Sequence, residues 1–225
     1  MPRTSAFVIA AAVAAACALS ACGPVKMGSA AITGGQRLTA TTLSEQVTAL
    51  EQAYQASKGR IQLQFPKSEA PRQVLSWLLR FRIRDELAAR NHVFVTAGES
   101  YNALNLLQKQ TGRTGPAFDQ LLVANGIAPD MKPELGRWLA IQNEMFIRLN
   151  GGTLPRTQAR TQVIGIQFNH RECVAAKSLN IQVNPQYGQM NYSAPFSVIP
   201  APSTLSAPTR PSPSPTPKPQ LTPPC

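Results

Sequence analysis

The sequence is poor in histidine, cysteine and acidic residues. Its 225 residues include two histidines, four cysteines and 11 Asp+Glu. Two histidines and four scattered cysteines exclude a conventional multi-ligand zinc framework, and carboxylates this sparse exclude a dense calcium site. The sequence contains no recognisable catalytic motif: no nucleophilic residue occurs with a general base, and no pair of residues has the pattern of a general acid and base. We therefore predict that the protein is not an enzyme and uses no metal and no cofactor.

Positive charge and apolar residues are abundant by comparison. The 22 Lys+Arg give a net charge of +11, and 43% of the residues are hydrophobic. This apolar content is too high for a wholly disordered chain, and the length fits one domain with a tail. The charge permits contact with anionic surfaces.

The first residues have the pattern of a bacterial lipoprotein signal. Arg3 precedes an apolar run over residues 6–19, which is too short for a spanning helix of about 20 residues and suits a signal peptide. The run ends in a lipobox-like sequence, Leu19-Ser20-Ala21-Cys22. We predict cleavage after residue 21 and lipidation of Cys22; an ordinary secretory signal and a short membrane helix are the alternatives.

These features predict an exported protein anchored by lipid to the outer face of the cytoplasmic membrane. Two or more acyl chains hold a protein stably on a bilayer, and a lipidated Cys22 carries at least two. The predicted organisation is a signal peptide over residues 1–21, a lipidated linker over 22–30, a folded domain over 31–192 and a tail over 193–225. We expect no nucleic-acid partner for an exported lipoprotein.

The tail is dense in proline, which removes amide donors and favours extended, disordered chain. It ends in Cys225. Disulfides persist outside the cytoplasm, so Cys173 and Cys225 are a possible pair. The alternative is two independent thiols, with Cys173 buried as a small apolar residue.

Capping signals divide the domain into helices. Thr42 with Glu45, and Thr96 with Glu99, have the spacing of a capping box. Ser68 and Pro71 predict the start of a long apolar helix. Further helices are expected after Pro116, up to Asn125-Gly126, and from residues 130–133 up to Asn150.

The segment over residues 153–179 is compatible with a strand or a helix, and we favour a helix. Ile181 and Val183 then predict a short strand whose partner is the segment Ala31-Ile32-Thr33. The predicted fold class is mainly α: a compact bundle of five or six helices, with a short two-stranded β element joining the two ends of the domain.

Three motifs resemble the SurA and PrsA foldases and actinobacterial lipoproteins with a SurA-type N-terminal domain. The first is the stretch over residues 27–39, MGSAAITGGQRLT, followed at once by a helix. The second is the helix end over residues 87–96, LAARNHVFVT, and the third is VNPQYG over residues 183–188. Those lipoproteins carry a similar lipobox and a Gly-Pro start, here Gly23-Pro24.

The resemblance has departures. Gln186 stands where arginine is usual, and Gln189-Met190 replaces an aromatic-acidic pair. The isomerase members insert a parvulin domain of roughly a hundred residues, and no segment here is spare for one. The resemblance therefore implies a chaperone module without isomerase activity, acting as a holdase or folding helper on unfolded or extended exported polypeptides. A non-catalytic envelope scaffold or partner-binding lipoprotein is the alternative.

A chaperone module requires exposed apolar surface on which unfolded chains can dock. The candidate client-binding residues are aromatic or methionine side chains: Trp77, Phe81, Trp138, Met145 and Phe146. The alternative for each is a place in the core. Candidate contacts to anionic lipid headgroups or acidic segments are the arginines crowded on one helix: Arg72, Arg80, Arg82 and Arg84. The alternative is a solvated helix face.

Overall fold

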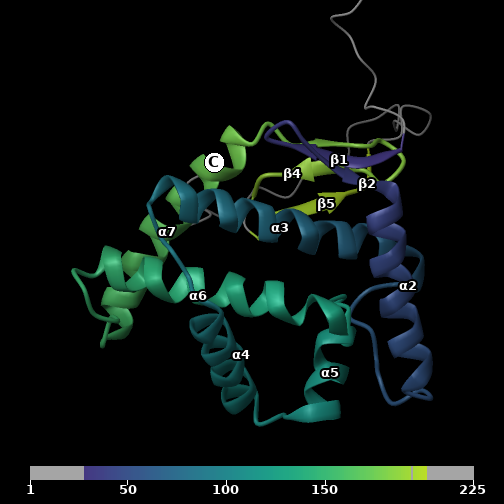
Figure 1. The fold of residues 1–225 in the computed structure, drawn as a ribbon, viewed down its shortest axis with the longest axis horizontal. Helices are drawn as coiled ribbons and strands as arrows, with labels where there is room; N and C mark the ends of the chain where they lie inside the picture. Colours follow the sequence, from purple (N-terminus) through teal and green to yellow (C-terminus); the bar gives the residue numbers. More distant parts are fainter. Residues whose placement is uncertain (1–27, 194, 202–225) are drawn as a thin grey trace, which may run out of the picture.

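The computed structural model describes residues 28–193 and 195–201 and has the predicted mainly α fold (Figure 1). The helices are α2 (Ala40–Ala56), α3 (Ala70–Arg90), α4 (Ala97–Thr111), α5 (Gly115–Ala124), α6 (Lys132–Leu149) and α7 (Gln158–Ser178), with short 3-10 turns η2 (Lys67–Glu69) and η3 (Pro129–Met131). The strands are β1 (Ser29–Thr33), β2 (Gln36–Thr39), β3 (Gln182–Val183), β4 (Gln189–Asn191) and β5 (Ser197–Ile199). The helix over residues 153–179 that we favoured is α7.

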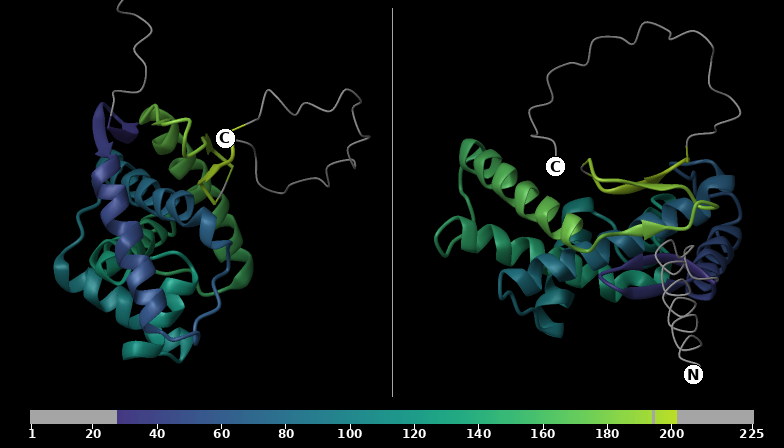
Figure 2. Two further views of the ribbon diagram at one scale, coloured as in Figure 1. Left: turned by 90° about the vertical axis from the view of Figure 1, so that its right-hand side faces the viewer. Right: turned by 90° about the horizontal axis from the view of Figure 1, so that it is seen from above.

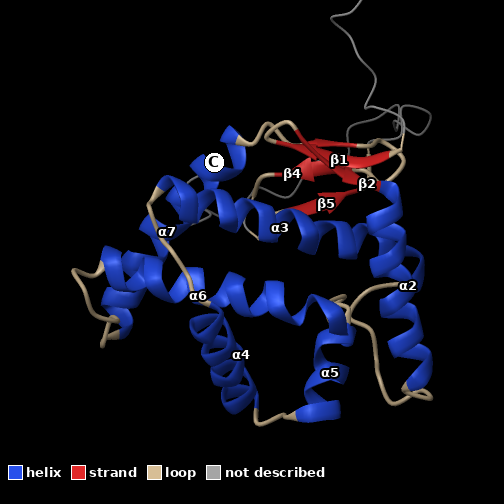
Figure 3. Cartoon of the chain, in the orientation of Figure 1, coloured by secondary structure: helices blue, strands red, loops and turns tan. Residues whose placement is uncertain are grey.

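The predicted β element joins the two ends of the domain. Strand β1 pairs antiparallel with β3, with Ala31 opposite Val183 and Ile32 opposite Gln182. The sequence analysis missed β2, which pairs with the other edge of β1 and makes a three-stranded sheet in the order β2-β1-β3 (Figure 3). The β1–β2 turn is Gly34-Gly35, and both glycines have positive φ, a conformation that residues with a side chain rarely adopt.

The predicted tail boundary at residue 193 was wrong, because β4 and β5 form a second antiparallel pair against α3. Phe196 and Val198 are buried. The backbone N–H of Val198 donates to Ser76 Oγ at 2.8 Å, and Arg80 Nε donates to the Phe196 carbonyl at 2.6 Å. Two apolar residues at strand spacing thus bury side chains on α3, despite the prolines around them.

Helix α2 begins three residues before the predicted capping box at Thr42. Its N-cap is Thr39, whose Oγ1 accepts from the Thr42 backbone N–H at 3.0 Å. The reason is tertiary: β2 ends at Thr39, and the Ala40 N–H donates to the Gly28 carbonyl at 2.8 Å. The strand therefore leads directly into the helix.

The other predicted box is confirmed at the start of α4. Thr96 Oγ1 accepts from the Glu99 N–H at 3.2 Å, and the Glu99 carboxylate accepts from the Thr96 N–H at 2.7 Å. Gly112 ends this helix in the left-handed region. The predicted ends of α5 and α6, at Asn125 and Asn150, are also confirmed.

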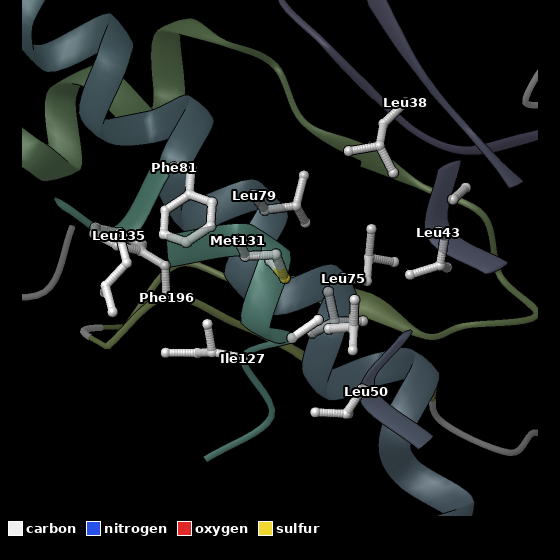
Figure 4. Packing of buried hydrophobic residues seen from close by; sticks show 14 of the residues in the cluster. Leu38, Leu43, Leu50, Leu75, Leu79, Phe81, Ile127, Met131, Leu135 and Phe196 are labelled. Carbon is white, nitrogen blue, oxygen red and sulfur yellow. The ribbon is translucent and has the colours of Figure 1, made fainter. Parts of the chain in front are cut away.

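Helix α3 runs through the centre of the molecule. It packs against α2, α6, α7 and β5, and Leu75, Leu79 and Ile83 are at most 1% exposed. Figure 4 shows side chains of α2, α3 and the η3–α6 segment meeting around Leu75 and Leu79. A smaller second cluster, which includes Ile141 and Phe168, lies beyond this core.

A buried ion pair links α3 to α7. Arg84 Nε donates to Glu172 Oε1 at 2.7 Å, and the two side chains are 3% and 9% exposed. Arg84 Nη1 also donates to the Trp138 carbonyl and to Gln142 Oε1 on α6, each at 3.2 Å. The guanidinium lies over the Trp138 ring at 4.1 Å and the Phe168 ring at 4.7 Å. Burial lowers the pKa of Arg84, and the Glu172 charge opposes that shift.

Replacing one member of this pair leaves an uncompensated buried charge, which is strongly destabilising. We expect Glu172→Ala to lower the free energy of unfolding by about 3 kcal/mol, measured by urea denaturation of the Cys22→Ser protein. The control is Glu144→Ala, which removes the exposed Arg148–Glu144 pair and should cost below about 1 kcal/mol. In the double variant Arg84→Met/Glu172→Leu, stability should recover. Equal effects of the two single substitutions would contradict a structural role for the buried pair.

Candidate functional site

An open, mostly apolar groove lies between α4 and the start of α6. Its volume is about 660 Å³. Apolar side chains of α4 and the preceding loop line it, among them Val95, Tyr101 and Leu104. Ser100, Gln108 and Glu134 add polar groups. The groove is therefore an open, mostly apolar channel between two helices.

Helix α4 packs on one side only, which leaves this groove open. Its contact is mainly with α6, and Ala103 is its one buried residue. The contact is close because Gly136 of α6 faces the α4 backbone: a Cβ at this position would lie 2.7 Å from the Ser100 carbonyl oxygen. A glycine in the helix interior thus sets the separation of the two helices.

Large apolar side chains remain exposed along this helix. Phe94, just before α4, is 85% exposed, and Tyr101 is 65% exposed. On the opposite flank Leu106 is 47% exposed and lines a second, smaller groove of about 230 Å³. Burying an exposed Phe or Leu side chain contributes roughly 1.5–3 kcal/mol of binding free energy. A ligand that covers these side chains would therefore be bound by apolar contacts.

The charges near the groove are paired with carboxylates from other helices. Lys132 Nζ donates to Asp119 Oδ1 of α5 at 3.0 Å. Arg137 Nε donates to Asp85 Oδ1 of α3 at 2.8 Å, and its Nη1 approaches the Val95 carbonyl at 3.5 Å. These two cations are thereby neutralised, so they give the groove no strong preference for an anionic ligand.

The five predicted client-binding residues lie elsewhere, and they do not form one exposed surface. Phe81 and Met145 are buried, at 7% and 1% exposure, so the alternative of a core position holds for them. Trp77, Trp138 and Phe146 are partly buried. The Trp77 ring centroid lies 5.9 Å from that of Phe81 and 6.0 Å from that of Trp138. These aromatics are therefore internal packing.

The predicted arginine surface is also mostly internal. Arg84 is in the buried pair, and Arg80 donates to the Phe196 carbonyl and lies 4.7 Å over the Trp77 ring. Arg72 donates to the Tyr187 carbonyl at 3.2 Å and pairs with Glu69. Of the four, Arg82 alone is exposed. The crowding of arginines on this helix reflects contacts to the chain's own C-terminal segment and to α7.

The remaining predicted sites fall largely outside the described residues. Cys22 and the lipobox residues Leu19, Ser20 and Ala21 all lie there. Cys173 is disulfide-bonded; Cys225, its predicted partner, lies outside the described residues, so the pairing stays a prediction.

Over residues 28–193 and 195–201, no group of three or more His, Cys, Asp or Glu side chains is arranged to hold a metal ion. Within the same ranges no helix is both long and apolar enough to cross a membrane.

The groove was not predicted from the sequence, since none of the predicted site residues lies on α4 or within residues 132–137. Helical spacing identifies which side chains share a face, and it does not say whether another element covers that face. One signal was available: Gly136 stands inside a helix, where glycine is costly unless a close backbone approach requires it.

Comparisons with protein-family models, with curated proteins and with solved structures found no match to this chain.

The close approach at Gly136 can be tested with a matched pair of substitutions. Gly136→Ala would push α4 away from α6 because the obstructing atom belongs to the backbone. We expect a loss of about 1–3 kcal/mol in unfolding free energy. Gly165→Ala in α7 meets nothing within 4 Å and should raise stability by up to about 1 kcal/mol, the difference in helix propensity. Chemical denaturation of both variants measures these changes in unfolding free energy. An increase in unfolding free energy for both substitutions would contradict the close contact at Gly136.

The capping box that begins α4 predicts a pH dependence. Hydrogen bonds from the Thr96 backbone and then its hydroxyl lower the pKa of Glu99 from 4.5. A carboxyl with a lower pKa in the folded state contributes stability above its unfolded pKa and loses that contribution as pH falls through its folded pKa. The wild-type protein should therefore be more stable than Glu99→Gln at pH 7, and the difference should vanish as pH falls below the lowered pKa of Glu99. A difference independent of pH in thermal denaturation would contradict this role.

Proposed function

We propose that this protein is a membrane-anchored extracytoplasmic lipoprotein that acts as a holdase or folding helper for exported polypeptides, without isomerase activity. Unfolded or extended segments of those polypeptides dock in the α4–α6 groove. The lipid on Cys22 holds the protein at the outer face of the cytoplasmic membrane. The observation that carries the proposal is the open groove of about 660 Å³ beside the exposed Phe94 and Tyr101.

The chemistry of the groove suits extended chains of varied sequence. Its lining is mainly apolar, so affinity would come from burial of client side chains, which is non-directional. Polar groups such as Ser100 and Gln108 can satisfy backbone groups of a docked chain. The paired cations Lys132 and Arg137 add little selection by charge. Holding an unfolded chain in this way requires no acid, base or nucleophile.

The open flanks of α4 support reversible binding. A micromolar dissociation constant corresponds to about 8 kcal/mol, which burial of four or five apolar client side chains at roughly 1.5–2 kcal/mol each would supply. Because α4 contributes a single buried residue, the exposed side chains on its flanks can change rotamer to accept client side chains of different size at little cost in core packing.

The proposal is tested with the mature Cys22→Ser protein, residues 22–225, and an unfolded exported polypeptide. The wild-type surface should suppress aggregation at stoichiometric amounts. Phe94→Ser/Tyr101→Ser should weaken binding of a fluorescent unfolded peptide about tenfold or more, since each ring contributes on the order of 1 kcal/mol. Both side chains are exposed, so the fold should be retained, which circular dichroism checks.

The matched control is Leu154→Ser, which removes another exposed apolar side chain, 53% exposed, in the α6–α7 loop. It should leave binding unchanged. Absence of suppression by the wild-type protein at several-fold excess would overturn the holdase proposal and favour a scaffold or partner-binding lipoprotein. Equal weakening by the Leu154 substitution would show that the groove is not the docking site.

A further inference from the structure

Acidic residues are almost absent from the last third of the sequence. Beyond Glu144 the chain has one carboxylate side chain, Glu172, against seven basic ones: Arg148, Arg156, Arg160, Arg171, Lys177, Arg210 and Lys218. Glu172 is buried against Arg84. Its charge is therefore already neutralised inside the protein, and it cannot offset the surface cations around it.

Helix α7 lies at the edge of the molecule (Figure 2) and carries three of these cations, Arg160, Arg171 and Lys177. Its other side packs against α3 and α6. Arg160, His170, Arg171 and Lys177 are exposed, and at 100° per residue they fall within roughly 120° of the helix circumference. We call this surface, together with the apolar residues between them, the α7 face.

The positive charges of Arg160 and Arg171 are not cancelled by the hydrogen bonds that these two side chains make. Arg160 Nε donates to Asn150 Oδ1 at 2.6 Å, and Arg171 Nη1 donates to Asn91 Oδ1 at 2.7 Å. Both acceptors are neutral amides. Near the C-terminal end of the helix, Glu86 accepts from Ser178 Oγ at 3.2 Å and is paired with Arg90.

Aliphatic side chains lie among the cations. Val163, Ile166 and Val174 are 44–45% exposed and share the α7 face by helical spacing. A face that combines basic and aliphatic side chains fits the boundary between anionic headgroups and acyl chains, where the cations contact phosphate and the apolar groups enter the lipid. A soluble polyanion would make no use of the exposed aliphatic groups.

The predicted lipid anchor is within reach of this face. The Gly34 N–H at the end of β1 donates to the Leu179 carbonyl, just after α7, at 2.6 Å. Ser29, at the start of β1, lies seven positions after Cys22, and this stretch spans at most about 25 Å. An anchored domain therefore stays close enough to the bilayer for the α7 face to touch it.

We propose that the α7 face is a second membrane contact, which binds anionic lipid headgroups and orients the domain on the bilayer with the α4–α6 groove free. The contact concerns α7 alone and does not require client binding by the groove. With the anchor on Cys22, it would hold the protein by two independent attachments.

The test is cosedimentation with vesicles of the mature Cys22→Ser protein, residues 22–225, which carries neither the lipid nor the apolar run over residues 6–19. Vesicles of phosphatidylglycerol and phosphatidylcholine should bind it, and pure phosphatidylcholine vesicles should not. Arg160→Gln/Arg171→Gln should weaken binding at least tenfold, because each cation near an anionic surface contributes about fivefold. Binding independent of anionic lipid, or unchanged in this variant, would overturn the proposal.

Control variants separate this surface from net charge and from the groove. Lys109→Gln/Arg113→Gln removes two exposed cations at the end of α4 and should change vesicle binding less than about twofold. Phe94→Ser/Tyr101→Ser should bind vesicles normally, so failure of the lipid contact and failure of the holdase proposal are distinguishable. Thermal denaturation checks that each variant is folded.

A polyanion is the competing occupant. Val163→Ser/Ile166→Ser keeps all the cations and should weaken vesicle binding severalfold, and polyphosphate should compete poorly. If this variant binds vesicles as the wild type does and polyphosphate binds equally well, the α7 face is a polyanion site and the lipid proposal is wrong.

Discussion

The ion pair between Arg84 and Glu172 organises the helical layer of this protein. One guanidinium bonds the carboxylate on α7 and two oxygens on α6, and it lies between the rings of Trp138 and Phe168. Desolvating a charge is costly, so the arginine is stable in the interior only while all three helices stay in register around it. The central helix α3 is thereby bonded to both α6 and α7, and the side of α7 that faces α3 is buried in that contact. The exposed side of α7 carries the cations.

Two surfaces with different chemistry follow from this arrangement. Helix α4 lies outside the three-helix contact and attaches mainly to α6, across Gly136, so its flanks stay open and apolar. Helix α7 is firmly attached on one side, and its other side is basic and aliphatic. The first suits extended polypeptide and the second suits an anionic bilayer. They are carried by different helices, and a protein that holds unfolded chains close to a membrane would use both at the same time.

Much of the fold could be predicted from local signals. The capping box at Thr96 and Glu99, the glycine at 112 and the asparagines that end α5 and α6 act within one helical turn, so the sequence around them suffices. The pairing of β1 with β3 was predicted as well, although 150 residues separate the strands. The predictions failed where the structure of a segment depends on a distant part of the chain. Thr39 caps α2 because strand β2 ends there. Phe196 and Val198 belong to the folded domain and not to the proline-rich tail, because they are buried against α3. The groove was missed for the same reason, since Tyr101 is exposed only because no element covers it.

The sequence by itself determined which segments become helices, where most of them begin and end, and that the chain is basic and mainly α. Caps, prolines and hydrophobic spacing act over a few residues, and they need no partner elsewhere. Only the tertiary structure decided which side chains remain available. Arg82 and Arg84 are two residues apart and chemically identical, yet they point roughly 200° apart around α3. One is exposed to solvent, and the other is buried against a carboxylate 88 residues further along the chain. Whether a charge binds a partner or supports the core depends on what packs against it, and that depends on the whole fold.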